Sequence, residues 1–358
     1  MKRKIIFIIL TFSIMSIMPT AKALDTSKSS VVMDLNSGRV LYQKNANEKR
    51  LIASITKIMT AIITLENISL NKEIKVGEEV LKMYGTNIYV EVGEKITIKD
   101  LLYGLLLRSG NDASVVLANA VSKNEEEFVK LMNTKAQEIG MKNSTFSNPH
   151  GLDEETKNYS TAYDMALLSK YAYQNETYRK ISGTKKYTTK TNNKTYLWYN
   201  RNKLLINYEY CTGGKNGYTP SAGRTLVTTA SKDNLNLTVV TLNDPNEYET
   251  HEELYEYVFN NYKNYTIIDK NSFTIDKSFY DGTAYIKESF VYPLTEEELA
   301  KVKTKIHIAN GETKDHKIGT AVIELDNTEI GKLDIYNKTS TKKEDKSIFT
   351  KLKELIFG

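Results

Sequence analysis

Residues 54–65 read SITKIMTAIITL and form the predicted centre of the fold. The apolar side chains follow helical spacing at Ile55, Ile58, Met59, Ile62, Ile63 and Leu65. Positions three apart share one face of a helix, so the Ser54 hydroxyl and the Lys57 amine are expected to lie side by side. The stretch therefore predicts a buried helix that begins with a serine and a lysine in contact.

Strands are predicted on both sides of a helical middle. Residues 29–43 read SSVVMDLNSGRVLYQ, which is typical of a hairpin that turns at Asn36-Ser37-Gly38. Two further strands, Thr225–Ala230 and Leu235–Leu242, are predicted to pair. The other predicted helices are Lys99–Arg108, Ala113–Val121, Glu125–Ile139, Ala162–Tyr173 and His251–Asn260. This order predicts an α+β domain over residues 24–262, whose sheet brings the two ends of the domain together.

The pattern changes after about Asn264. Short segments there alternate apolar and polar residues and are separated by the turn pairs Asp281-Gly282, Asn310-Gly311 and Asp326-Asn327. They predict a small all-β domain over residues 263–337. A polar linker follows at residues 338–346.

The last twelve residues, SIFTKLKELIFG (347–358), have their apolar side chains on one face of a helix. A short basic amphipathic helix on a polar linker favours an anionic membrane surface. The alternative is a last helix that docks on the protein's own core.

Residues 1–23 have the pattern of a secretory signal peptide. Lys2-Arg3-Lys4 precedes an apolar run from Ile5 to Met18, and Ala21-Lys22-Ala23 is a cleavage site. An uncleaved membrane anchor is the alternative, although the run is short for a membrane span. We expect cleavage before Leu24 and a mature protein at the outer face of the cytoplasmic membrane or in the cell wall.

The composition excludes several classes of protein. The chain has 358 residues, 26% of them charged and 40% hydrophobic, as expected for a soluble globular protein. Four of its 49 basic residues, and none of its 44 acidic residues, lie in the leader, so the mature chain is almost neutral. That balance gives no electrostatic basis for a nucleic-acid partner.

The cysteine and histidine content argues against thiol and zinc chemistry. Cys211 is the one cysteine, and we expect it to fill space in a strand rather than to act as a nucleophile. The four histidines show no H-x-x-x-H spacing, which disfavours a zinc hydrolase. We therefore expect no metal and no cofactor.

Three short motifs can carry the chemistry. Ser54-Ile55-Thr56-Lys57 is S-x-x-K, in which a lysine with a lowered pKa can deprotonate the serine. The chain holds four copies of this spacing, but the other three (Ser69/Lys72, Ser182/Lys185 and Ser340/Lys343) do not begin a strongly apolar helix.

The second and third motifs are Ser109-Gly110-Asn111 and Lys215-Asn216-Gly217. Ser109 can relay a proton, Asn111 can hold an amide and Lys215 can bind a carboxylate. A second S-x-N, Ser122-Lys123-Asn124, is expected to cap a helix instead. Each triplet alone is more typical of an ordinary loop.

Together, in this order, S-x-x-K, S-x-N and K-x-G resemble the serine penicillin-recognising enzymes. The surrounding sequence is similar to the low-molecular-mass penicillin-binding proteins that act as D-alanyl-D-alanine carboxypeptidases. The resemblance is carried by ANEKRLIASITKIMTA (46–61), LLLRSGNDASVVLA (105–118), FSNPHGLD (146–153), YSTAYDMALLSKYA (159–172) and GGKNGYTPSAGRTLVTTA (213–230). It implies the penicillin-binding, β-lactamase-like transpeptidase fold, followed by the small β domain and the amphipathic helix.

The resemblance also implies a role for each motif. Ser54 would attack the carbonyl between the terminal D-Ala residues of a peptidoglycan stem pentapeptide, and Lys57 would take its proton. Ser109 would relay protons and Asn111 would hold the substrate. Lys215, with Asn216 and Gly217, would bind near the terminal carboxylate, and the backbone N–H groups of Ser54 and Tyr218 would form the oxyanion hole. A β-lactam would acylate the same Ser54.

Three departures from the family pattern have expected effects. Asn216 stands where threonine is usual, and we expect altered affinity because an amide can still donate a hydrogen bond. Ile52 stands where proline often precedes Ala-Ser, and we expect this to affect the approach of the chain to the helix more than the chemistry. His150 lies in the HGLD segment, and we expect it to stabilise the loop rather than to act in catalysis.

Rival functions remain open at this stage. A class A β-lactamase needs a deacylating glutamate, and the spacing E-x-x-x-N occurs at Glu154–Asn158 and at Glu256–Asn260. The first copy lies in a charged loop and the second in an apolar helix, so we expect both to be coincidental. A D,D-transpeptidase or endopeptidase differs only in the acceptor or the bond cleaved. A non-catalytic cell-wall scaffold would not need all three reactive motifs.

Overall fold

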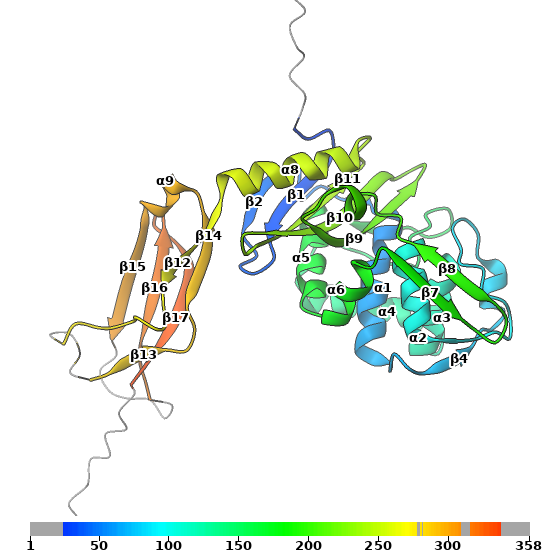
Figure 1. The fold of residues 1–358 in the computed structure, drawn as a ribbon, viewed down its shortest axis with the longest axis horizontal. Coiled ribbons are helices and arrows are strands. Elements are labelled where there is room, and N and C mark those ends of the chain that lie inside the picture. The colour runs from blue at the N-terminus through cyan, green and yellow to red at the C-terminus, as the bar shows by residue number, and fades with distance from the viewer. Residues whose placement is uncertain (1–23, 278–279, 281, 309–315, 338–358) are drawn as a thin grey trace, which may run out of the picture.

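Strands from both ends of the first 262 residues meet in one antiparallel sheet. The computed structural model describes residues 24–277, 280, 282–308 and 316–337. The sheet has the order β2-β1-β11-β10-β9 (Figure 1). Its strands are β1 (Ser29–Asp34), β2 (Val40–Lys44), β9 (Cys211–Thr219), β10 (Gly223–Lys232) and β11 (Leu235–Leu242). Val31 of β1 lies opposite Val240 of β11, so the predicted joining of the ends is confirmed.

Each face of this sheet is covered by helices. Successive residues of a strand point to opposite faces. Val31 accordingly packs in the large core with α1 (Lys57–Asn67) and α5 (Ala162–Tyr173), while Val32 packs in a smaller core with α8 (Glu247–Asn261). Figure 1 shows α8 along one side of the sheet and α5 on the other. The sheet is therefore buried on both faces, which explains its continuous apolar runs.

The helices around α1 agree closely with the sequence pattern. The helix predicted at Ala162–Tyr173 has those limits in the structure. α3 (Asn111–Val121) begins two residues before the prediction, and α4 (Glu125–Glu138) ends one residue before it. The predicted helix at Lys99–Arg108 consists of α2 (Ile98–Tyr103) and a π-helical turn, η3 (Gly104–Arg108). A continuous apolar run does not distinguish α from π hydrogen bonding, so the turn could not be foreseen.

Several short elements had no sequence signal. They are β3 (Arg50–Leu51), β6 (Tyr159–Ser160), β4 (Glu73–Lys75), β5 (Lys95–Thr97), β7 (Lys186–Lys190), β8 (Thr195–Tyr199), η2 (Glu78–Lys82), α6 (Glu176–Ser182) and α7 (Leu204–Asn207). The β7–β8 hairpin is held by aromatic packing, because Tyr187 stacks on Tyr103 with ring centroids 3.6 Å apart. This hairpin lies beside α2 and η3 (Figure 1).

The chain after α8 forms a smaller β structure. β12 (Lys263–Ile268) pairs with β14 (Phe290–Leu294), and a second sheet has the order β13-β17-β16-β15. Its strands are β13 (Ala284–Ile286), β15 (Val302–Ile308), β16 (Lys317–Leu325) and β17 (Thr328–Asn337), and a short helix α9 (Glu296–Leu299) precedes β15. The predicted turn at Asp326-Asn327 joins β16 to β17 with both φ angles positive, at 49° and 64°.

One arginine links the two parts of the molecule. Arg39, in the hairpin between β1 and β2, pairs with Glu298 of α9 and donates to the carbonyl oxygen of Pro293. Its guanidinium also lies 5.6 Å and 5.2 Å from the ring centroids of Tyr262 and Tyr292. These contacts attach the β structure to the edge of the main sheet.

The predicted leader (residues 1–23), the predicted linker and the helix predicted at residues 347–358 lie outside the described residues, as do Asp281 and the turn pair Asn310-Gly311. Within the described part of the chain, no helix combines the length and apolar character needed to cross a membrane.

Candidate active site

Ser54 lies in a tight turn at the beginning of α1. The turn is the 3-10 helix η1 (Ala53–Thr56), whose first N–H groups have no partner within the helix. Ala53 adopts a left-handed conformation with a φ of 48°, which is costly for a residue with a side chain. The Ile52 carbonyl accepts a hydrogen bond from Thr225 Oγ1 at 3.0 Å. The turn is thus fixed from the sheet side, and Ser54 is half-buried within it.

Two glycines allow other backbone segments to approach this turn. A Cβ atom on Gly151 would lie 2.0 Å from the Ala53 carbonyl oxygen, and one on Gly217 would lie 2.7 Å from the Ser54 nitrogen. Gly217 therefore allows β9 to lie against the N–H group of Ser54. The two glycines lie against opposite ends of the same peptide unit.

Lys57 is fully buried beside Ser54. Its Nζ donates to Ser54 Oγ at 3.0 Å, to Asn111 Oδ1 at 2.8 Å and to the carbonyl oxygen of His150 at 2.5 Å. Burial, and then the charge of Lys215, hold the pKa of Lys57 well below its usual value, and Asp112 opposes the shift only in part. The site therefore favours the neutral amine, which is the form that can accept the proton of Ser54.

Asn111 and Ser109 have different surroundings. Asn111 begins α3, and its Nδ2 donates to the Tyr84 carbonyl oxygen at 2.7 Å while its Oδ1 holds Lys57. Ser109 is buried with a φ of 66° between η3 and α3. The Ser109 hydroxyl has no hydrogen-bond partner among the described residues. The second motif therefore contributes one fixed side chain and one hydroxyl that is free to interact with a substrate.

Lys215 is buried inside β9. Gly213 and Gly214 remove the apolar alternation that would have marked the strand. Lys215 Nζ donates to the Asn216 carbonyl oxygen at 2.5 Å, and Asn216 Oδ1 is 3.5 Å away. Burial, and then the charge of Arg201, lower the pKa of Lys215 to about 7.

Tyr218 has an exposed side chain that packs near a cation. Its register partner across β9 and β10 is Arg224, whose guanidinium lies 5.7 Å from the ring centroid. Because Tyr218 follows Gly217 in the same strand, its backbone continues the edge that approaches Ser54.

Asp112 is a buried residue that the sequence reasoning did not select. Its carboxylate accepts hydrogen bonds from the backbone N–H groups of Ile88, Tyr89 and Val90, at 3.0, 2.6 and 3.2 Å. The same loop is held by Asn111, whose N–H donates to the Thr86 carbonyl at 2.8 Å. Residues 84–90 are therefore fixed beside the Lys57–Asn111 pair. Arg201, whose charge acts on both lysines, binds Thr86 of this loop at 3.1 Å.

His150 stabilises its loop, as its position in a turn predicted. Nδ1 accepts from the Leu152 N–H at 3.1 Å, and the backbone carbonyl holds Lys57. Burial, and then the charge of Lys57, lower the pKa of His150 to about 3, so the ring is neutral at physiological pH. A neutral ring that accepts at Nδ1 carries its proton on Nε2.

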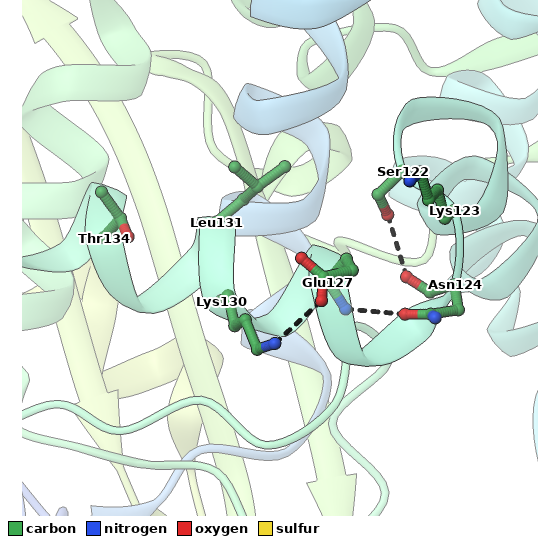
Figure 2. A pocket seen from close by; sticks show the side chains of 7 residues that line it. All are labelled: Ser122, Lys123, Asn124, Glu127, Lys130, Leu131 and Thr134. Carbon is green, nitrogen blue, oxygen red and sulfur yellow. Dashed lines mark hydrogen bonds and ion pairs between the residues drawn. The ribbon is translucent and has the colours of Figure 1, made fainter.

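Other sequence candidates lie away from this site. Asn124 of the second S-x-N caps α4 by accepting from the Glu127 N–H at 2.8 Å, as predicted (Figure 2). Glu256 of the second E-x-x-x-N lies on α8 and accepts from the Tyr208 hydroxyl, and Glu154 of the first is exposed. Cys211 is buried in β9, as expected, and burial raises the pKa of its thiol to about 11.

No group of three or more His, Cys, Asp or Glu side chains in the described ranges is placed to hold a metal ion. The nearest cluster of charged groups around Ser54 is dominated by cations instead, namely Lys57, Lys215 and Arg201.

Comparisons with known proteins extend over most of the chain. Residues 17–246 match the family model of the peptidase S11 D-alanyl-D-alanine carboxypeptidases. The D-alanyl-D-alanine carboxypeptidase DacF of Bacillus subtilis is 32% identical over 347 residues, which cover 90% of this chain and 88% of that protein.

Solved structures share the fold as well. Penicillin-binding protein 5 from Haemophilus influenzae superposes with a TM-score of 0.75 at 26% identity, covering 89% of this chain and 98% of that chain. A mutant of the Streptomyces K15 DD-transpeptidase superposes with a TM-score of 0.61 at 30% identity, covering 66% of this chain and 97% of that chain. The longer match includes the β structure after α8.

Proposed function

Because the chain belongs to the peptidase S11 family of D-alanyl-D-alanine carboxypeptidases, we propose that its serine-type D,D-carboxypeptidase activity is carried by Ser54 and Lys57. The observation that supports this most strongly is the contact of Lys57 Nζ with Ser54 Oγ at 3.0 Å, inside a site that disfavours the lysine's charge. A serine beside a neutral buried amine is an activated nucleophile.

The proposed reaction proceeds in two steps. The neutral amine of Lys57 takes the proton of Ser54, and Ser54 Oγ forms a bond to the carbonyl carbon between the two terminal D-Ala residues. The C–N bond then breaks, the amine of the last D-Ala receives that proton through Ser109, and an acyl-enzyme remains. Water, deprotonated in the same way, hydrolyses the ester and regenerates Ser54.

The remaining motif residues bind the substrate in this proposal. The backbone N–H groups of Ser54 and Tyr218 stabilise the oxyanion, because β9 runs against η1 at Gly217. Asn111 keeps Lys57 in place and borders the acyl chain. Lys215 and Arg201 attract the terminal carboxylate, with Asn216 and Gly217 beside it. A β-lactam would acylate Ser54 through the same groups.

The decisive experiment measures D-Ala released from a stem pentapeptide that ends in D-Ala-D-Ala. We expect release by the wild type and none by Ser54→Ala, while Ser69→Ala, at another S-x-x-K spacing, retains the activity. Fluorescent penicillin should label the wild type and Ser69→Ala alone. Release by Ser54→Ala would overturn the assignment. Transfer of the acyl group to an added amine, in preference to water, would indicate a transpeptidase instead.

We further propose that the protein acts outside the cytoplasm, bound to the membrane surface. Members of the family act on peptidoglycan, which is extracytoplasmic. In this proposal the leader ends at Ala23, the catalytic domain spans residues 24–262, and the β domain, residues 263–337, carries the linker and the amphipathic helix. The apolar face and the lysines of residues 347–358 suit an anionic surface.

The membrane proposal is tested by flotation with vesicles. The chain from Leu24 to Gly358 should float with phosphatidylglycerol vesicles and much less with neutral phosphatidylcholine vesicles, and deletion of residues 347–358 should abolish flotation. Equal flotation of the deleted protein would overturn the assignment of this segment as the anchor.

A further inference from the structure

The loop of residues 147–158 is joined to the beginning of α1 by hydrogen bonds from two of its ends. Near the start of the loop, the His150 carbonyl oxygen accepts from Lys57 Nζ at 2.5 Å. At its end, Asn158 Nδ2 donates to Thr56 Oγ1 at 3.0 Å. The loop is therefore fixed to the segment that carries both the serine and its base.

The β9–β10 hairpin forms the other side of the site. On β10, Thr225 lies opposite Gly217, and its Oγ1 donates to the Ile52 carbonyl oxygen at 3.0 Å. At the end of β9, Thr219 Oγ1 accepts from the Ala222 N–H at 3.0 Å and so fixes the turn of the hairpin. β9 is at the edge of the sheet, so in the described part of the chain no further strand holds its outer side.

A buried hydrogen bond joins this hairpin to the loop. Thr219 Oγ1 donates to Asp153 Oδ2 at 2.6 Å, and both residues are only 8% exposed. A hydrogen bond to a carboxylate is shorter and stronger than one between neutral groups. Its loss would also leave a buried polar atom without that partner. The bond is therefore a firm attachment for the outer end of β9.

Tyr218 lies between the two attachments of the hairpin. Thr225, opposite Gly217, holds one side of it, and Thr219 holds the other. The inference rests on the proposed function, in which the backbone N–H of Tyr218 is one donor of the oxyanion hole. Without the bond to Asp153, the end of the hairpin could turn about the remaining attachment, and this N–H would move relative to Ser54.

We propose that Asp153 is a positioning residue for the reaction: by holding Thr219, it keeps the Tyr218 N–H in place to stabilise the oxyanion. Asp153 needs no contact with the substrate for this role. Because the same loop holds Lys57 through the His150 carbonyl, the base and the oxyanion donor have a common support. Their relative position is then preserved when the substrate enters.

The test measures the acylation of Ser54 by fluorescent penicillin at several concentrations, which separates the acylation rate constant from the affinity of the preceding complex. Thr219→Val removes the hydroxyl and keeps the shape of the side chain. We expect the acylation rate constant to fall by about tenfold or more, because a displaced donor stabilises the transition state less. The affinity should change little. D-Ala release should show the same division, with kcat lowered and KM nearly unchanged.

Conservative variants distinguish this role from a general contribution to stability. Thr219→Ser keeps the hydroxyl and should recover most of the acylation rate, and Asp153→Asn keeps an acceptor oxygen and should recover part of it. Asp153→Ala should be as slow as Thr219→Val, and the double variant no slower than either, since both remove the same hydrogen bond. Asp153→Ala provides the same test if Thr219→Val does not fold.

The matched control is Thr238→Val. Thr238 is fully buried in β11, and its Oγ1 lies 2.8 Å from Ser169 Oγ on α5, two elements that carry no motif residue. This variant should lose comparable unfolding free energy and acylate at the wild-type rate.

The possible failures are distinct. Acylation of Thr219→Val at the wild-type rate, an equal fall in Thr238→Val, or no recovery in Thr219→Ser would overturn the positioning role of Asp153. A wild-type protein that takes no label at Ser54 would contradict the proposed function, and with it the oxyanion role of Tyr218.

Discussion

Lys57 and Lys215 are both buried, and the charge of the exposed Arg201 acts on each of them, so the protonation of these two lysines affects both chemistry and stability. Sequence reasoning could select the two lysines from the motifs, because each motif is local. It could not select Arg201 or Asp112, since their importance depends on segments that only the fold brings together, such as Thr86 against Arg201 at 3.1 Å.

Lys215→Met should stabilise the protein, and the gain should be larger at pH 6 than at pH 10. The pKa of Lys215 falls to about 7 in the folded state, while the unfolded lysine keeps its ordinary value. Between these values the unfolded state binds the extra proton, so the contribution of Lys215 to stability rises with pH. Urea unfolding at several pH values checks this. A larger gain at pH 10 would contradict the low pKa.

Asp112→Asn should reduce both stability and activity. The substitution removes the charge that holds three backbone N–H groups of residues 88–90, and we expect a loss of about 2 kcal/mol in the free energy of unfolding. Because that loop also borders Asn111, kcat/KM for D-Ala release should fall at least about tenfold.

A matched control for this variant is Asp164→Asn. Asp164 is equally buried and accepts from the Asn143 N–H and the Ser144 hydroxyl, both at 2.7 Å, in a loop that does not contact Lys57. It should lose comparable stability and retain kcat/KM. Equal losses of activity in the two variants would show that Asp112 acts only through global stability.

At the scale of elements, prediction worked where hydrogen bonding is local and the apolar period is regular. Ala162–Tyr173 has both properties, and its limits were predicted. β9 has neither, because its three glycines, Gly213, Gly214 and Gly217, leave no alternation to detect. The close approach of β9 to η1 requires a glycine at position 217. The same glycine that allows this approach therefore also weakens the strand pattern in the sequence.

The loop around Gly151 gives a prediction at this scale. Gly151→Ala combines an unfavourable positive φ of 87° with a Cβ atom 2.0 Å from the Ala53 carbonyl oxygen, so the turn that carries Ser54 must shift. Acylation by fluorescent penicillin should slow by about 100-fold, the loss typical of a displacement near 1 Å.

Gly140→Ala is the control that measures the cost of a positive φ alone, without a steric clash. Gly140 has a similar φ of 84°, but nothing lies within 4 Å of the added Cβ. We expect a loss of about 1 kcal/mol in unfolding free energy with an unchanged acylation rate. Similar acylation rates in the two variants would show that η1 tolerates the displacement.

At the scale of the whole molecule, Arg39 determines how the β structure is held. Its side chain is 15% exposed and combines an ion pair with two aromatic contacts, which is stronger than an exposed pair. Arg39→Ala should allow the two parts to move independently, seen as a larger radius of gyration in small-angle scattering, with unchanged D-Ala release from a soluble peptide.

Arg224→Ala is the control for this substitution. Arg224 also pairs with a glutamate, Glu247, but its side chain is 54% exposed and both residues lie within the catalytic part. The radius of gyration should stay that of the wild type. An identical radius in Arg39→Ala would show that other contacts, such as Asn264 with the Asn234 carbonyl at 2.8 Å, suffice.

The pairing of β1 with β11 affects how the protein is made. β1 leaves the ribosome early, yet its partner Leu235–Leu242 emerges only after the whole helical cluster has been synthesised. The sheet therefore cannot close during most of translation, and such distant pairings form slowly. A chain whose sheet cannot yet close stays unfolded for longer during synthesis, and an unfolded chain is the form that the export proposed above requires.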